Sequence, residues 1–148
     1  MKFYRVNGFT LIELMIVTVV VAILATIAVP SYSSYVVRSS RVAAQTELLE
    51  MTGLQEKIYL NSNAYSSSIT GAYTGAAAGG LGKTSQTRDG KYDFTVSVSA
   101  PSQTYTLTAI PVSGKAQKGN GCLTIQENGM RRWHENTDGC NAALPKPW

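Results

Sequence analysis

The sequence is short of the side chains that metal centres and nucleophilic sites require. In 148 residues it has one histidine, His134, and two cysteines, Cys122 and Cys140. A structural zinc site takes four such ligands, and no nucleophile motif lies near the histidine. We therefore expect no metal, no cofactor and no enzymatic activity, and we interpret His134 as a solvent-exposed residue of a strand or loop.

Charged residues are also scarce, at 15%, and they are unevenly distributed along the chain. From Phe9 to Val29 the only ionisable side chain is Glu13, and every other carboxylate lies at or beyond Glu47. The formal charge is +4, and removing the first eight residues leaves 11 basic and 9 acidic side chains. So mild a balance does not by itself call for nucleic acid or an anionic membrane as a partner.

A long apolar run occupies the N-terminal part of the chain. The 21 residues from Phe9 to Val29, followed by Pro30, would span about 32 Å as a helix, which is close to the hydrocarbon thickness of a bilayer. Lys2 and Arg5 precede the run, so the N-terminus is expected in the cytoplasm and the remainder on the other side. The sequence predicts a single membrane-spanning helix.

Two ordinary kinds of apolar segment are the alternatives. A cleavable signal peptide has some support, because Thr26-Ile27-Ala28 offers small residues to a general signal peptidase. A plain membrane anchor would also be apolar. Neither explains Glu13, because an isolated charge inside the membrane costs a few kcal/mol and so indicates a specific partner.

The residues around this charge resemble a known processing signal. Gly8-Phe9-Thr10-Leu11-Ile12-Glu13 is similar to the class III signal of type IV pilins and pseudopilins. The resemblance implies that residues 1–8 form a leader, that a prepilin peptidase cuts between Gly8 and Phe9, and that Phe9 is then N-methylated. It also implies that residues 9–35 form the membrane and filament-core helix, with a kink at Pro30.

Residues 36–148 are expected to form a soluble head. Apolar residues recur at helical spacing up to about residue 61, at Ala44, Leu48, Met51, Leu54 and Ile58. Residues 62–90 are rich in glycine and serine and predict a long loop with little structure of its own. Residues 91–148 alternate apolar and polar side chains in short runs, typical of strands, and Asn128-Gly129 favours a hairpin. The predicted fold is α+β: a long N-terminal helix packed on a three- or four-stranded antiparallel sheet.

The two cysteines lie near the C-terminus. An even pair in an exported chain favours a disulfide that closes a loop of about 17 residues, with two free thiols as the alternative. The interval between Cys122 and Cys140 also resembles the C-terminal disulfide-bounded region of pilins.

Two further motifs are candidate ligand sites. Gly82-Lys83-Thr84 matches the end of a phosphate-binding loop, but the position of the first required glycine is Ala77, which argues against nucleotide binding. Arg131, Arg132 and Trp133, with Lys115 and Lys118 before them, could contact nucleic acid. The alternative is a solvated strand edge whose charges discourage unwanted pairing.

The resemblance implies a structural subunit of a type IV pilus, major or minor, most similar to minor pilins of the type IVa class. Its expected partners are other pilin subunits, prepilin peptidase, the pilus assembly machinery, the inner membrane before assembly and, less directly, DNA. Such a filament would support adhesion, twitching motility or DNA uptake. The alternatives are a recognition module for DNA or a host surface, and a type II secretion pseudopilin, against which the cysteine pair argues.

Overall fold

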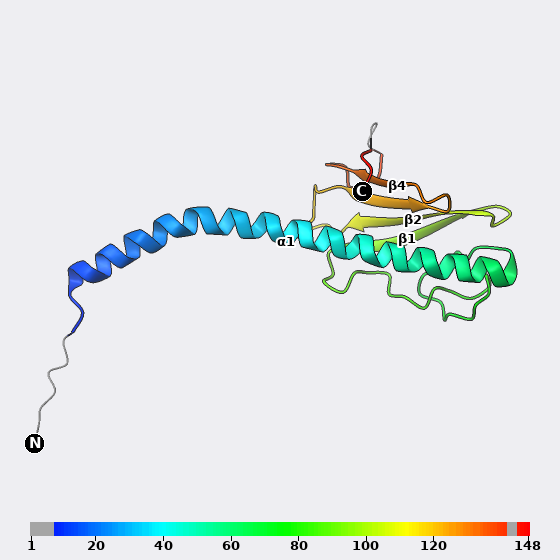
Figure 1. Ribbon diagram of the computed structural model, residues 1–148, viewed down its shortest axis with the longest axis horizontal. Helices are drawn as coiled ribbons and strands as arrows, with labels where there is room; N and C mark the ends of the chain where they lie inside the picture. The colour runs from blue at the N-terminus through cyan, green and yellow to red at the C-terminus, as the bar shows by residue number, and fades with distance from the viewer. Residues whose placement is uncertain (1–7, 142–144) are drawn as a thin grey trace, which may run out of the picture. The chain divides into compact units, whose positions relative to one another are not determined.

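The computed structural model describes residues 8–141 and 145–148. Helix α1 (Leu11–Ser62) is followed by strands β1 (Tyr92–Ser99), β2 (Thr104–Pro111), β3 (Cys122–Gln126) and β4 (Arg131–His134) (Figure 1). The chain divides into two compact units, which meet between Val36 and Val37. The fold of the head is a helix packed on a four-stranded antiparallel sheet, so the predicted α+β class is confirmed.

The part of α1 in the head has one buried stripe at helical spacing. Its members are buried in the head and are Ser40, Ala44, Leu48, Met51, Gln55 and Ile58. Leu54, which was predicted in this stripe, is partly buried and packs against the core. The helix ends where Asn63 takes a positive φ of 50° and donates its backbone N–H to the carbonyl of Tyr59. An asparagine in this conformation is a common helix terminator, and Asn63 is part of the predicted break.

The strands are connected in sequence order, so the sheet is a meander. Its inner face contributes apolar side chains in a strict alternation, for example Tyr92 and Phe94 on β1 and Tyr105, Leu107 and Ala109 on β2. The alternate positions of these strands are mainly hydroxyl-bearing and less buried. Gly129 in the β3–β4 turn has a φ of 76°, which suits the predicted hairpin.

The segment between α1 and β1 has no helix or strand, but it is well packed. Tyr65, Ile69 and Leu81 are at most 7% exposed and join the core. Backbone hydrogen bonds join the two halves of this loop, from the N–H of Leu81 to the carbonyl of Ser68 and from the N–H of Lys83 to the carbonyl of Ile69. The segment is thus a loop without regular secondary structure, and backbone hydrogen bonds within it and contacts with the core hold it in place.

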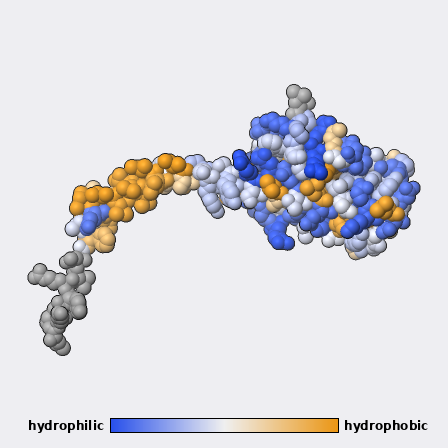
Figure 2. Space-filling model, viewed as in Figure 1, coloured by the Kyte–Doolittle hydropathy of each residue, from blue (hydrophilic) through white to orange (hydrophobic). Residues whose placement is uncertain are grey.

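The first unit presents a different surface. Its large apolar residues from Leu11 to Val29 are each 50–77% exposed, and they form the continuous apolar surface in Figure 2. Helix α1 is long and apolar enough to cross a membrane by length and composition. Pro30 lies inside α1, and the helix continues past it; the kink remains a prediction.

Candidate functional site

The beginning of α1 brings together the residues of the predicted processing signal. Thr10 is the N-cap residue, and Glu13 lies in the first turn. The Glu13 carboxylate Oε2 accepts from the Thr10 backbone N–H at 3.0 Å and from the Thr10 hydroxyl at 2.9 Å. The Glu13 N–H donates in turn to the Thr10 hydroxyl at 3.3 Å. These reciprocal contacts form a capping box, which the sequence pattern Thr-x-x-Glu could have indicated.

The capping box marks where helix α1 begins, and the Gly8–Phe9 bond lies before that point. Because helical structure begins at Leu11, the Gly8–Phe9 bond lies in irregular backbone, and the Phe9 side chain is 84% exposed. A peptidase needs such an accessible bond outside regular structure. The Lys2 and Arg5 side chains of the predicted leader lie outside the described residues.

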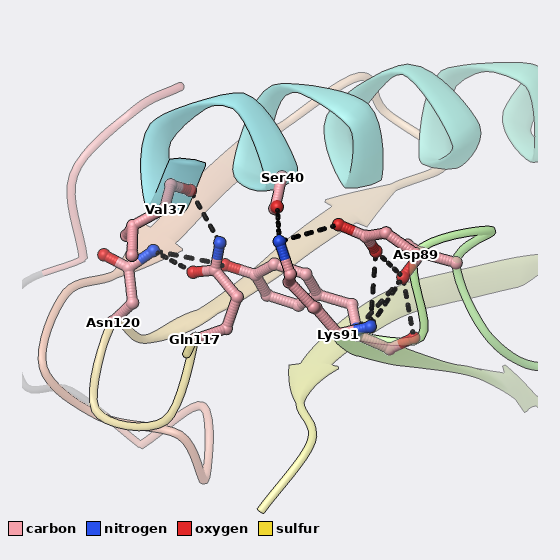
Figure 3. A network of polar contacts seen from close by, with 8 residues as sticks. Val37, Ser40, Asp89, Lys91, Gln117 and Asn120 are labelled. Atoms are coloured by element: carbon pink, nitrogen blue, oxygen red, sulfur yellow. Dashed lines mark hydrogen bonds and ion pairs between the residues drawn. The ribbon is translucent and has the colours of Figure 1, made fainter. Parts of the chain in front are cut away.

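A second group of polar contacts lies where α1 enters the head (Figure 3). Gln117, fully buried in the β2–β3 loop, donates its Nε2 to the backbone carbonyl of Val37 at 2.6 Å. Its Oε1 accepts from Asn120 at 2.6 Å and from the Tyr92 hydroxyl at 3.3 Å. Lys91 donates to the Ser40 hydroxyl at 2.7 Å, about one turn further along the helix. This network ties the first two turns of the helix within the head to the sheet.

Arg41 extends this attachment to the far edge of the sheet. Its guanidinium lies 3.8 Å from the centre of the Trp133 ring and donates to Asn120 Oδ1 at 3.0 Å. The Trp133 indole N–H donates to the Asn120 carbonyl at 2.9 Å. Trp133 is therefore engaged in internal contacts, and the hypothesis that its ring stacks on a base is not supported by this arrangement. Arg41, Gln117 and Asn120 were not found by sequence reasoning, because their partners on the helix and loop lie about 80 residues apart.

The basic residues around β4 lie on two elements. Arg131 and Arg132 are exposed on adjacent positions of the strand, and Lys115 and Lys118 are exposed in the β2–β3 loop. The ion pairs found among the described residues instead join three other lysines to carboxylates: Lys83 to Glu50, Lys91 to Asp89 and Lys146 to Glu135. Within that part of the chain, the two arginines and the two loop lysines have no carboxylate partner. They are therefore available to an external anion.

The position of His134 differs from the one predicted from the sequence. It is 8% exposed, so the prediction of an exposed histidine was wrong. Its Nε2 lies 3.5 Å from the Thr124 hydroxyl, and its Nδ1 is buried without a partner among the described residues. Burial, followed by the charge of Arg132, lowers the pKa of His134. The neutral imidazole is therefore the form that the fold accommodates.

The Cys122–Cys140 disulfide is formed, with its Cα atoms 5.4 Å apart. Within the loop that it closes, Asp138 accepts from the backbone N–H groups of Gly119 and Gly121, at 2.8 and 3.2 Å. The C-terminal residues then pair with the edge of β4, where Trp133 and Lys146 exchange two backbone hydrogen bonds. The disulfide loop thus holds the β2–β3 loop, which carries Gln117 and Asn120, in place.

The partial phosphate-loop pattern Gly82-Lys83-Thr84 has a structural role in the head. Lys83, the lysine of the phosphate-loop pattern, donates to Glu50 at 2.6 Å. Gly80 crosses the backbone at Gly71 so closely that no side chain would fit there. Among the described residues there is no cluster of three or more His, Cys, Asp or Glu side chains that could hold a metal ion.

Comparisons with known proteins agree with this geometry. Residues 30–126 match the family described as "Type IV minor pilin ComP, DNA uptake sequence receptor", and residues 4–29 match the prokaryotic N-terminal methylation motif. The fimbrial protein EcpC of Eikenella corrodens is 39% identical over 76% of this chain and 67% of that protein. The type IV major pilin PilA of Myxococcus xanthus is 40% identical over 42% of this chain, but only 28% of that protein.

A solved type IV pilin from Shewanella oneidensis aligns with a TM-score of 0.47 and 20% identity, covering 64% of this chain and 89% of that one. On the family match, which covers more than half of its length, the chain belongs to the type IV minor pilin ComP family. It is a structural subunit of a type IV pilus.

Proposed function

We propose that this chain is a minor pilin that enters the filament through α1, after cleavage between Gly8 and Phe9 and methylation of Phe9. The observation that carries the proposal is the exposed apolar surface of residues 11–29, which has a single carboxylate at its beginning. Before assembly this segment spans the inner membrane, with the N-terminus in the cytoplasm and the head in the periplasm. After assembly it lies among the helices of other pilins, and the head faces the outside of the cell.

Glu13 is the residue that aligns one subunit with the next. A charged side chain at the centre of a membrane-spanning helix costs about 2.5–3.5 kcal/mol on insertion scales, and a carboxylate within the apolar run is likewise unfavourable without a partner. The Thr10 capping box satisfies part of its hydrogen-bonding capacity within the chain. Cleavage after Gly8 creates an amine at Phe9, and in a bundle of helices the Glu13 carboxylate reaches the amine of a neighbouring subunit. Because an unpaired buried charge is costly, the pair favours one register.

The test compares Glu13→Gln and Glu13→Val with Glu47→Gln, a control that removes a carboxylate from the head part of the same helix. The quantity measured is the ratio of this subunit in sheared filaments to that in the membrane fraction. Both Glu13 variants should lower the ratio at least several-fold, and the control should not change it. Incorporation of Glu13→Val at the wild-type ratio would show that the carboxylate is not needed for assembly. A mature chain starting near Val29, detected by intact mass, would contradict the processing.

A second function, DNA binding, is favoured by the exposed cations of β4. Arg131 and Arg132 have no carboxylate partner in the described part of the chain, and the matching family is described as a DNA uptake sequence receptor. Since Trp133 is covered by Arg41, the contact we propose is with backbone phosphates rather than by stacking on a base. Lys115 and Lys118 are the neighbouring candidates on the β2–β3 loop.

DNA binding is tested with a labelled duplex and the detergent-solubilised chain over a range of salt concentrations. The Arg131→Gln/Arg132→Gln pair should weaken binding and reduce the slope of log affinity against log salt by about 1 for each phosphate that is no longer neutralised. Lys57→Gln, which removes an exposed cation from α1, is the control and should leave the slope unchanged. An unaltered slope in the arginine pair would reject this edge as the DNA-binding surface.

A further inference from the structure

The end of the head at which α1 enters carries three exposed cations. Arg38 lies on α1, and Lys115 and Lys118 lie in the β2–β3 loop; we call these three residues the entry cluster. Within residues 8–141 and 145–148, none of the three takes part in an ion pair, whereas Lys91 at the same end of the head pairs with Asp89. The charges of the entry cluster are therefore free to meet a partner outside the chain.

Buried contacts hold the two loop lysines beside the helix. Gln117, which lies between them in the sequence and is fully buried, donates its Nε2 to the carbonyl of Val37 at 2.6 Å (Figure 3). Asn120 of the same loop donates to Gln117 Oε1 at 2.6 Å. Arg38 directly follows Val37 on the helix. The entry cluster is thus a defined part of the head, built from two segments about 80 residues apart in the chain.

Acidic groups are scarce around the entry cluster. Residues 112–121 have no carboxylate, and α1 has none between Glu13 and Glu47. Asp138 contacts the loop, but it accepts backbone hydrogen bonds there and pairs with neither lysine. The local charge is therefore positive, and an anionic surface is the partner that fits it.

The place of the entry cluster in the chain indicates a membrane as that surface. Residues 11–29 are the exposed apolar part of α1, and the same helix continues into the head. Val37 comes eight positions after Val29, which is about 12 Å of helix. The headgroup layer adds about 5–8 Å on each side of the hydrocarbon core, and the long side chains of lysine and arginine can extend towards it. Basic side chains at this distance are attracted to anionic lipids.

We infer that the entry cluster binds anionic phospholipid headgroups of the leaflet on the head side of the membrane, before the subunit is assembled. The inference rests on the proposed function, since it requires α1 to span the membrane. Arg38 and the two lysines recognise the phosphodiester group and the net negative charge of the lipid, as hydrogen-bond donors and as counter-charges. The contact holds the head at the bilayer surface, and it is broken when the subunit leaves the membrane for the filament.

The entry cluster is distinct from the arginines proposed to contact DNA. Along the β3–β4 ladder, Ile125 pairs with Arg131 and Cys122 pairs with His134. The loop that carries the lysines leads into the ladder at Cys122, and Arg131 lies at its other end. A membrane surface and a DNA duplex are therefore met by different parts of the head.

The test measures how accessible the loop lysines are in the full chain reconstituted into vesicles. An amine-reactive reagent is added outside, and mass spectrometry gives the label at Lys115 and Lys118 relative to Lys57, an exposed lysine further along α1. In vesicles of phosphatidylcholine and phosphatidylglycerol in equal parts, this ratio should be at least about three-fold lower than in phosphatidylcholine alone. Salt at about 1 M should remove the difference, because the Debye length falls to about 3 Å.

Two variants at Arg38 test the charge without removing a labelled lysine. Arg38→Gln should reduce the difference between the two kinds of vesicle, and Arg38→Lys, which keeps the charge, should retain it. Arg38 is exposed and in no ion pair within the described residues, so both variants should keep the thermal midpoint of the wild type in detergent micelles.

Three results would contradict these assignments. Equal labelling ratios in the two kinds of vesicle would overturn the inference. Protection of Lys115 and Lys118 by a DNA duplex in detergent, without protection by anionic vesicles, would overturn it in favour of DNA as their partner. A chain that alkaline carbonate washing removes from both kinds of vesicle would instead reject the membrane-spanning helix of the proposed function.

Discussion

The two units use apolar residues in opposite ways. In the head, Leu48, Leu107 and Leu123 are fully buried, and they stabilise it through contacts within the chain. Before Val36, comparable residues such as Leu24 and Ile23 are about 60% exposed, so most of their surface is left for another molecule. The apolar side chains of the first unit are therefore not buried within the chain, and we propose that a membrane or other helices cover them.

The largest effect is expected from a substitution in the buried core of the head. Leu48→Ala removes a buried side chain and should lower the free energy of unfolding of the head by about 2–5 kcal/mol. Ile23→Ala removes the same kind of side chain from an exposed position and should leave the unfolding of the head unchanged. Denaturant unfolding of the full chain in detergent, followed by tryptophan fluorescence from the head, checks both. Equal losses would mean that the two units fold as one.

The disulfide should have the next largest effect, and only on the head. The Cys122→Ser/Cys140→Ser pair should lower the free energy of unfolding by about 3 kcal/mol, because the unfolded chain is no longer closed into a loop. A reducing agent should destabilise the wild type and leave the double variant unaffected. An unchanged denaturant midpoint in the double variant would show that the bond adds nothing to stability.

The same contrast explains what could be predicted from the sequence. The signal from Gly8 to Glu13 and the buried stripe of α1 are local patterns, as are the alternations in β1 and β2, and the sequence predicts such elements from neighbours a few residues apart. The packing of the 62–90 loop depends on Gly80 passing over Gly71, and His134 is buried beside Thr124 of the neighbouring strand. Arg41 reaches the Trp133 ring from the helix, across a long separation in the sequence. Contacts between residues far apart in the chain produce no periodic pattern in the sequence, so the sequence does not predict them.

A smaller effect is expected at the start of the first unit, where Thr10 caps helix α1. Thr10→Val removes the hydroxyl of the capping box and should destabilise the first turn of α1 by about 1 kcal/mol. Amide hydrogen exchange in micelles should be faster in the first turn, around Leu14, and unchanged in the head. Thr18→Val, the same change inside the helix, is the control and should leave the first turn protected. Equal exchange in both variants would show that Thr10 does not cap the helix.

The last effect concerns His134, whose burial in the head makes stability depend on pH. Above the unfolded pKa of about 6.5, the imidazole is neutral in both states and adds no pH dependence. As the pH falls through 6.5 towards the lower pKa of the folded form, the unfolded chain takes up the proton first, so the folded state loses stability. The loss cannot exceed about 1.4 kcal/mol for each pH unit below the unfolded pKa.

Two variants separate the imidazole from its charged neighbour in denaturant titrations between about pH 7.5 and 5.5, a range above the titration of ordinary carboxylates. His134→Gln should remove the slope of stability against pH. Arg132→Gln should reduce the slope without abolishing it, because burial, and only secondarily the arginine charge, lowers the pKa of His134. If the wild type and His134→Gln lost stability in parallel over this range, the buried imidazole would not be its cause.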